Sequence, residues 1–190
     1  MRVHAVPLAA PLAALSIVLG SLLAAPSQAD DGKAHGILNE FKIGVLHHDT
    51  DNLWSGFRRE SGADINLEAI FSPSYDVLSG TIRPAIGASI NSSGNTSKVY
   101  GGLRWQYETA ENLFFGIGLG AAVHNGDTDL KSNDTKALGS KLLFHIPLEA
   151  GYRFGGKHAL SIYFDHISNA YTQDANEGLD TLGLRYGYRF

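Results

Sequence analysis

The chain alternates between apolar and polar residues through most of its length, and almost none of it has a helical pattern. Successive side chains of a β-strand point to opposite faces, so this period of two predicts strands with one apolar and one polar face. Turn-forming residues interrupt the alternation and define eight strands, at Gly36–His47, Ala63–Phe71, Thr81–Ile90, Lys98–Tyr107, Leu113–His124, Ser140–Phe154, Ala159–Ser168 and Leu179–Phe190.

The polar positions of these strands are charged or glycine, whereas the inward face of a soluble β-sandwich is apolar. We therefore predict an all-β fold, an eight-stranded antiparallel transmembrane β-barrel whose apolar side chains face lipid. The charged side chains are expected to pair inside the narrow barrel; they are Asp64, Glu68, Arg83, Arg104, Glu149, Arg185 and Arg189. Because proline cannot donate to the ladder, Pro84 and Pro147 each predict a local bulge.

The connections between the strands alternate in length, which predicts short periplasmic turns and long extracellular loops. The short connections are 107–113 and 154–159, and the long ones are 49–62, 125–137 and 169–178. The last strand ends in Tyr188-Arg189-Phe190, which resembles the C-terminal signature of Gram-negative outer-membrane barrels. With both ends of the barrel on the periplasmic side, the strand 159–168 runs outward and Ser168 lies near its outer end.

Composition agrees with a membrane barrel. The chain has 22 Gly, 9 Phe and 8 Tyr, and a mean hydropathy of −0.07, because alternating strands are not strongly apolar on average. It has no cysteine, which excludes disulfides, thiolate metal sites and a cysteine nucleophile. The net charge of −4 is scattered and gives no nucleic-acid footprint. Aromatic residues near strand ends are predicted to form interface belts, among them Trp54, Trp105, Tyr186 and Tyr188.

Residues 1–29 have the features of a cleaved secretory signal. Arg2 precedes an apolar run that reaches about Ala25, and Ser27-Gln28-Ala29 fits the small-x-small cleavage pattern. Cleavage leaves residues 30–190 as one barrel domain. The alternative is an N-terminal membrane anchor, but the run is short for a span and is interrupted by prolines.

The strand 159–168 carries the chemistry. His166 and Ser168 are two residues apart, so a base and a hydroxyl share one face. This face also carries Leu160 and Ile162, which makes it the lipid-facing one, and Asp180 lies on the same face of the next strand. Polar residues facing lipid are costly unless they have a function.

These residues predict a serine esterase. Ser168 is the candidate nucleophile, His166 the general base, and Asp180 the acid that orients the imidazole. The Asn169 side chain or nearby backbone N–H groups are candidates for an oxyanion hole. Glu177 is a rival acid, but it lies in a predicted loop, and Asp165 points inward by parity.

Simpler interpretations remain open. A His-x-Ser pair occurs by chance in many proteins, and polar residues at the outer end of a strand also fit a solvated rim. The run His47-His48-Asp49-Thr50-Asp51 contains metal-ligating residue types, but neighbouring residues of a strand face opposite ways. We therefore favour a solvated loop entrance there and predict a reaction that needs no metal and no cofactor.

A resemblance rests on the C-terminal motif. His166-Ile167-Ser168-Asn169-Ala170, followed by Asn176-Glu177-Gly178-Leu179-Asp180, resembles the lipid A 3-O-deacylase (PagL-type) family. That family is an eight-stranded outer-membrane barrel with a His-x-Ser-Asn-Ala segment and then an Asn-x-Gly segment. The segment Gly62–Glu68 is similar to the family's second strand.

The resemblance implies hydrolysis of the ester-linked 3-hydroxyacyl chain at position 3 of lipid A, in the outer leaflet of the outer membrane. Carried over by position, the family's catalytic histidine and serine fall on His166 and Ser168, its oxyanion asparagine on Asn169, and its acid on Asp180. The family's acid is commonly glutamate, so the reach of the shorter Asp180 is in question. Proline is frequent where this chain has Glu177.

The partners implied are lipopolysaccharide and outer-membrane lipids, without nucleic acid, and a homodimer is left open. Other functions are also left open. One is a different outer-membrane lipid esterase, such as a phospholipase. Another is a non-enzymatic barrel with a structural, adhesive or permeability role, and a third is a family member that has lost activity through Asp180.

Overall fold

The computed structural model describes residues 36–190, so the predicted signal, residues 1–29, lies outside the described residues. The strands are β1 (Leu38–His47), β2 (Ala63–Phe71), β3 (Tyr75–Val77), β4 (Gly80–Asn91), β5 (Lys98–Glu108), β6 (Leu113–His124), β7 (Leu142–Phe154), β8 (His158–Ser168) and β9 (Leu179–Arg189). The predicted strands are confirmed, each end lying within a residue or two of its expected place. The described residues contain no helix of the length and apolar character needed to cross a membrane.

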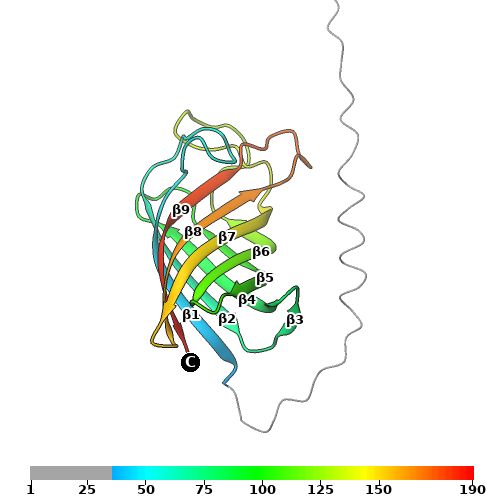
Figure 1. Ribbon diagram of the computed structural model, residues 1–190. Coiled ribbons are helices and arrows are strands. Elements are labelled where there is room, and N and C mark those ends of the chain that lie inside the picture. The colour runs from blue at the N-terminus through cyan, green and yellow to red at the C-terminus, as the bar shows by residue number, and fades with distance from the viewer. Residues whose placement is uncertain (1–35) are drawn as a thin grey trace, which may run out of the picture. The chain divides into compact units, whose positions relative to one another are not determined.

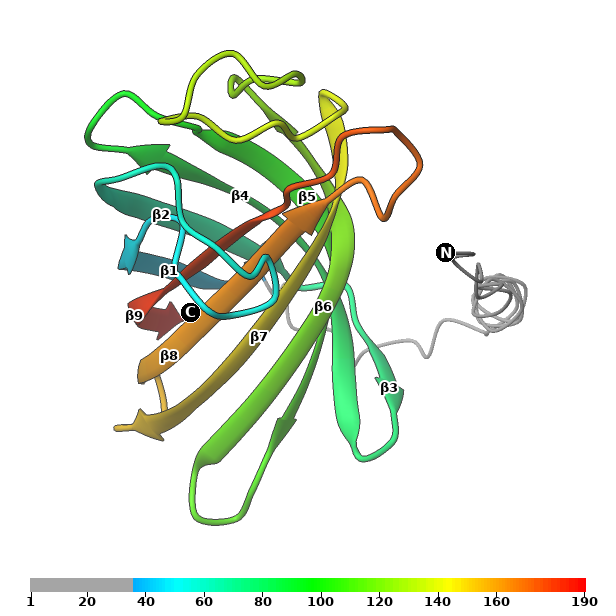
Figure 2. The ribbon, with the colours of Figure 1, turned by 90° about the horizontal axis from the view of Figure 1, so that it is seen from above.

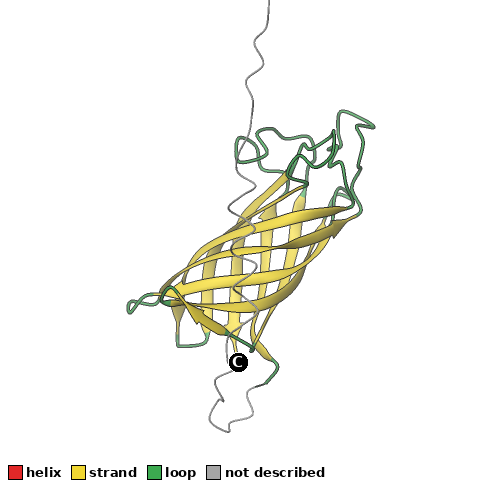
Figure 3. Cartoon of the chain, turned by 90° about the vertical axis from the view of Figure 1, so that its right-hand side faces the viewer, coloured by secondary structure: helices red, strands yellow, loops and turns green. Residues whose placement is uncertain are grey.

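The strands form a closed barrel. They follow the order β2-β1-β9-β8-β7-β6-β5-β4-β3, and a further pairing of β2 with β4 closes the wall. All of these pairings are antiparallel, and the long strands tilt around the barrel in Figure 3. The short β3 was not predicted, because three residues are too few to show a period. It pairs with the start of β4 and explains the long connection between β2 and β4.

Long loops gather at one end of the barrel, and the C-terminus lies with the short turns at the other end (Figure 1). The loops at the first end are 48–62, 92–97, 125–141 and 169–178, and the connections at the second are 72–79, 109–112 and 155–157. β8 therefore ends among the long loops.

The apolar side chains face outward and the charged ones inward, as predicted. On β8, Leu160 and Ile162 are exposed on the outer wall, whereas Ser161, Tyr163 and Asp165 are buried in the interior. This arrangement is expected of a barrel whose outer wall meets lipid.

Charged side chains pair inside the barrel. Glu68 lies 2.6 Å from Arg104 and 3.2 Å from Arg185. Arg185 also lies 2.7 Å from Glu149, and Lys42 lies 2.8 Å from the same carboxylate. Pairing of this kind is required because an unpaired buried charge is strongly destabilising.

The other three predicted interior charges have partners nearer the ends of the barrel, and Arg189 lies 3.0 Å from Glu108 at the turn end. Asp64 lies 2.9 Å from His48, at the loop end of the barrel. Arg83 donates to the backbone carbonyl of Ser72, at the turn end.

The predicted bulges at Pro84 and Pro147 are wrong, because the strand register is the same before and after each proline, although the β6–β7 ladder skips Pro147 and Ile146. Pro84 lies beyond the last β2 partner, Ala85, and beyond the last β3 partner, Ile82, so that side of β4 needs no N–H from it. Gly118 faces Pro147 from β6, and a Cβ at Gly118 would lie 2.7 Å from the proline Cγ. Glycine therefore leaves room for the ring.

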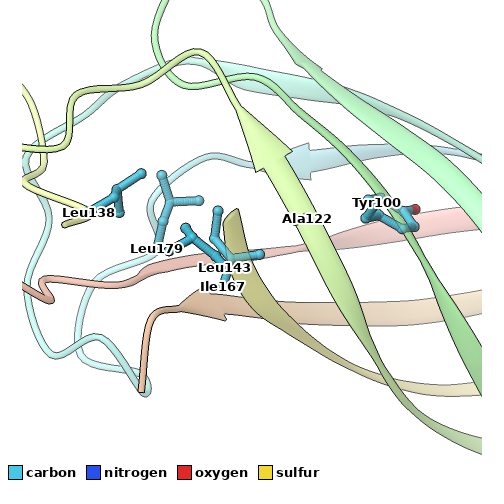
Figure 4. Packing of buried hydrophobic residues seen from close by; sticks show 6 residues of the cluster. All are labelled: Tyr100, Ala122, Leu138, Leu143, Ile167 and Leu179. Atoms are coloured by element: carbon cyan, nitrogen blue, oxygen red, sulfur yellow. The ribbon is translucent and has the colours of Figure 1, made fainter. Parts of the chain in front are cut away.

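A small apolar cluster supports the strand segment that carries the motif. Leu138 of the 125–141 loop meets Leu143, Ile167 and Leu179 of β7, β8 and β9 (Figure 4). Ile167 is fully buried and lies between His166 and Ser168 in sequence. Its packing turns both of these neighbours to the outer face of β8.

Candidate active site

The ladder between β8 and β9 brings the candidate base and acid together. His166 and Asp180 are direct partners in this ladder, and the imidazole Nδ1 lies 2.6 Å from the Asp180 Oδ1. Ser168 follows on the same face of β8, opposite Phe144 of β7. Within residues 36–190 no hydrogen bond joins the Ser168 hydroxyl to the imidazole, and catalytic hydrogen bonds often form only when substrate is bound.

Asp180 is held on both sides. Its Oδ2 accepts a hydrogen bond of 2.6 Å from the Ser55 N–H, and its backbone carbonyl accepts one of 2.8 Å from the Thr50 N–H. The carboxylate is fully buried. The shorter acid therefore reaches His166, while the loop between β1 and β2 holds its second oxygen.

The rival acids have other partners. Glu177 forms an ion pair of 3.1 Å with Arg59 and accepts a hydrogen bond of 2.7 Å from the Ala137 N–H. Asp165 points into the barrel, where it accepts a hydrogen bond of 2.7 Å from Thr181 and lies 3.1 Å from His145. Neither carboxylate contacts His166.

Trp54 covers the imidazole. Its ring stacks on that of His166 with centroids 4.5 Å apart and planes 10° apart. Trp54 is 58% exposed, whereas His166 is only 5% exposed. The β1–β2 loop that carries Trp54 crosses β8 and β9 in Figure 2, so a base on the outer wall is screened from water.

Trp54 differs from the other aromatic residues predicted for the interface belts. Tyr186 and Tyr188 do lie with His158 and Phe154 near the turn end of the barrel. Trp54 and Ser55 were missed as site residues, because the period-two pattern says nothing about where a loop folds back.

Asn169 holds the turn after Ser168. Its amide Nδ2 donates to the carbonyls of Leu138, at 3.0 Å, and Ala175, at 2.6 Å. Its backbone N–H donates to the side-chain oxygen of Asn176 at 2.9 Å. All of its N–H donors therefore have partners within the protein, and Asn169 fixes the loop that leaves β8.

The next two residues have an uncommon backbone. Ala170 and Tyr171 have φ angles of 52° and 61°, a left-handed conformation that costs non-glycine residues about 1–2 kcal/mol each. Their N–H groups make no hydrogen bond within the described part of the chain. Ala170 and Tyr171 are the central residues of an exposed turn, which the Thr172 N–H closes by donating to the Asn169 carbonyl at 3.1 Å.

Buried polar residues join the loops above the barrel. His48 lies 3.0 Å from Asp64 and 2.9 Å from Glu60. Lys136 is fully buried, and its ammonium lies 2.8 Å from Asp49. Among residues 36–190 no three or more His, Asp or Glu side chains are arranged to hold a metal ion.

Two members of this group of buried polar residues, here called the loop cluster (His48, Asp49, Glu60, Asp64 and Lys136), have shifted pKa values. Burial alone would lower the pKa of His48, but hydrogen bonds to Asp64 and Glu60 outweigh burial and raise this pKa above its usual 6.5. Burial would raise the pKa of Glu60, but hydrogen bonds from His48, Thr96 and Lys136 lower it from 4.5 to about 2. Both groups are therefore stabilised in their charged forms.

These shifts predict that the loop cluster is most stable between about pH 4.5 and 6.5. The lowered pKa of Glu60 contributes stability above 4.5, and this contribution is lost as the pH falls toward about 2. The raised pKa of His48 contributes stability below 6.5, and this contribution is lost as the pH rises through the folded-state pKa. Hydrogen exchange of residues 48–62, corrected for its intrinsic pH dependence, measures both limits.

A His48→Gln variant is the control for this prediction. Glutamine keeps a hydrogen-bonding amide but does not titrate, so the loss of protection on the alkaline side should disappear. If protection against hydrogen exchange in this variant is still lost as the pH rises, another group causes that loss.

The chain matches a known family along most of its described length. The model of the family described as Lipid A 3-O-deacylase (PagL) matches residues 36–189. The lipid A deacylase PagL of Bordetella bronchiseptica is 23% identical over 176 residues, which cover 93% of this chain and 92% of that protein.

Solved structures share the barrel. The crystal structure of the outer membrane enzyme PagL superposes with a TM-score of 0.60 at 20% identity, covering 78% of this chain and 99% of that one. The N-terminal β-barrel domain of Pseudomonas aeruginosa OprF superposes with a TM-score of 0.50 at 13% identity, covering 80% and 98%. At these identities the structural likeness establishes the fold alone.

Proposed function

The chain belongs to the lipid A 3-O-deacylase (PagL) family, and from this premise we propose that it is an outer-membrane serine esterase that removes the acyl chain at position 3 of lipid A. Membership of the family makes it a hydrolase that acts on lipid A. The proposal of a serine esterase that acts at position 3 rests on one observation, the His166–Asp180 pair beside Ser168 on the outer wall of the barrel.

In the proposed reaction, the Ser168 oxygen attacks the ester carbonyl while the imidazole Nε2 takes the hydroxyl proton. Asp180 accepts the hydrogen bond from Nδ1, which leaves Nε2 free to act as the base. The bond between the carbonyl carbon and the sugar oxygen then breaks, and the sugar oxygen takes the proton from the imidazolium. Water, deprotonated by His166, then attacks the acyl-serine. The imidazolium returns the proton to the Ser168 oxygen as the fatty acid leaves.

We propose that the backbone N–H groups of Ala170 and Tyr171 stabilise the oxyanion. Their left-handed conformation and their free donors support this assignment. Asn169, whose own donors are engaged, has the role of holding this turn. We therefore assign the oxyanion role to the backbone N–H groups of Ala170 and Tyr171, in place of the Asn169 side chain.

The surroundings of Ser168 suit a membrane lipid. Phe144 lies opposite Ser168 and is exposed on the outer wall, and Leu160 and Ile162 continue the apolar surface along β8. The ester of a glycolipid in the outer leaflet would meet the site there, because the long-loop end of such a barrel is extracellular.

Mass spectrometry of lipids exposed to the protein tests this function. Vesicles that contain both lipid A and phospholipids are incubated with wild type and with His166→Ala. We expect wild type to remove one 3-hydroxyacyl chain from lipid A at position 3 and to leave phospholipids intact, whereas the variant should leave both lipids intact. Hydrolysis of phospholipid alone would indicate a phospholipase, and no hydrolysis by wild type would indicate a non-enzymatic barrel.

A Gly178→Ala substitution should lower kcat/KM about ten-fold. Gly178 has a φ angle of 61°, and an added Cβ would lie 3.0 Å from the Cε1 of His166. Alanine is strained in this conformation and would push on the imidazole. Gly156→Ala is the matched control, because Gly156 has a φ of 71° and open space around it at the other end of the barrel. Equal losses in the two variants would mean that backbone strain, and not contact with His166, is the cause.

A further inference from the structure

Lys136 is a buried cation whose contacts lead to the proposed active site. It belongs to the 125–141 loop and is fully buried. Its Nζ lies 2.8 Å from the Asp49 Oδ1 and 3.2 Å from the Ser55 Oγ, and it lies over the ring of Phe57 at 4.7 Å. A buried ammonium is costly unless it is paired, so this one ties two loops together at a defined point.

Ser55 connects this cation to the proposed catalytic acid. Its hydroxyl accepts from Lys136, while its N–H donates to the Asp180 Oδ2 at 2.6 Å. The other oxygen of Asp180 meets the His166 Nδ1 at 2.6 Å. An unbroken series of contacts therefore runs from Lys136 through Ser55 and Asp180 to His166.

We propose that Lys136 is a positioning residue for the esterase reaction, which acts through Ser55 to hold Asp180 against His166. This inference rests on the proposed function. Asp180 has a short side chain, and its position depends on a donor from the 48–62 loop. Lys136 fixes that loop from two sides, because Asp49 and Ser55 both belong to it. The correct geometry of a catalytic group depends on such support.

The test measures Lys136→Met in the wild-type and in the Asp180→Ala backgrounds. Methionine keeps an apolar chain of similar length and removes the ammonium. If Lys136 acts through Asp180, the substitution lowers kcat about ten-fold in wild type, leaves KM unchanged, and has no further effect once Asp180 is absent. A purely structural role would lower kcat by the same factor in both backgrounds, and that result would overturn the inference, as would an unchanged kcat in wild type.

Two further variants separate the contacts of Lys136. Asp49→Asn weakens the ion pair but leaves the ammonium on Ser55, so its effect should be smaller than that of Lys136→Met. Ser55→Ala removes the hydroxyl and keeps the N–H to Asp180, and combined with Lys136→Met it should add no further loss. If Lys136→Met does not give a folded barrel, judged by heat-dependent mobility in gel electrophoresis, Ser55→Ala carries the same two-background test.

Failure of the inference and failure of the proposed function give different results. If Asp180→Ala keeps full activity, the acid assigned in the proposed function is wrong. If Asp180→Ala loses activity but Lys136→Met loses the same factor with and without Asp180, only the positioning role is wrong.

Discussion

Replacing Ser168 by alanine is expected to lower kcat for lipid A deacylation by about four orders of magnitude. The substitution removes the proposed nucleophile and leaves the His166–Asp180 pair in place. Residual turnover would come from the oxyanion donors and from direct attack by water. The measurement is the initial rate of 3-hydroxy fatty acid release from lipid A vesicles, followed by mass spectrometry.

Ser161→Ala is the matched control for Ser168→Ala. Ser161 is on the same strand but points into the barrel, where its hydroxyl donates to Glu149 at 2.5 Å. We expect its loss to leave kcat near the wild-type value. A Ser168→Ala variant that kept a tenth or more of wild-type activity would indicate direct attack by water, with His166 as the base and no acyl-serine.

The barrel could be predicted from the sequence because its alternation is local. On β6, for example, exposed Phe115, Ile117 and Leu119 alternate with Phe114, Gly116 and Gly118, and the pattern holds whatever the strand pairs with. The prolines misled the prediction for the opposite reason. Whether a missing N–H matters depends on the neighbouring strand, and at Pro84 the pairing on that side has already ended.

The candidate site was partly predictable for the same reason. Parity alone placed His166 and Ser168 on one face, and Asp180 beside them on the next strand. It could not show what covers them. Trp54 and Ser55 reach the site from a loop more than a hundred residues away in the chain, and no periodic pattern encodes where a loop folds back.

Lengthening the acid is expected to harm this protein, although glutamate is common at this position in the family that the sequence resembles. Asp180→Glu should lower kcat about a hundred-fold. The Asp180 carboxylate is fully buried and lies 2.6 Å from both the His166 Nδ1 and the Ser55 N–H. An added methylene must displace the imidazole, the 48–62 loop, or both. The measurement is kcat and KM on lipid A vesicles.

Asp180→Asn separates the length of the acid from its charge. It keeps the length but loses the negative charge that stabilises the imidazolium, so it should also reduce kcat, while the stacking of Trp54 on His166 should persist. In Asp180→Glu the charge remains and the stacking should be disturbed, which a change in Trp54 fluorescence would report. An Asp180→Glu variant more active than wild type would contradict this picture. That result would mean that the Asp180 side chain is too short to orient His166 well. The hydrogen bond from the Ser55 N–H would then not determine where the carboxylate lies.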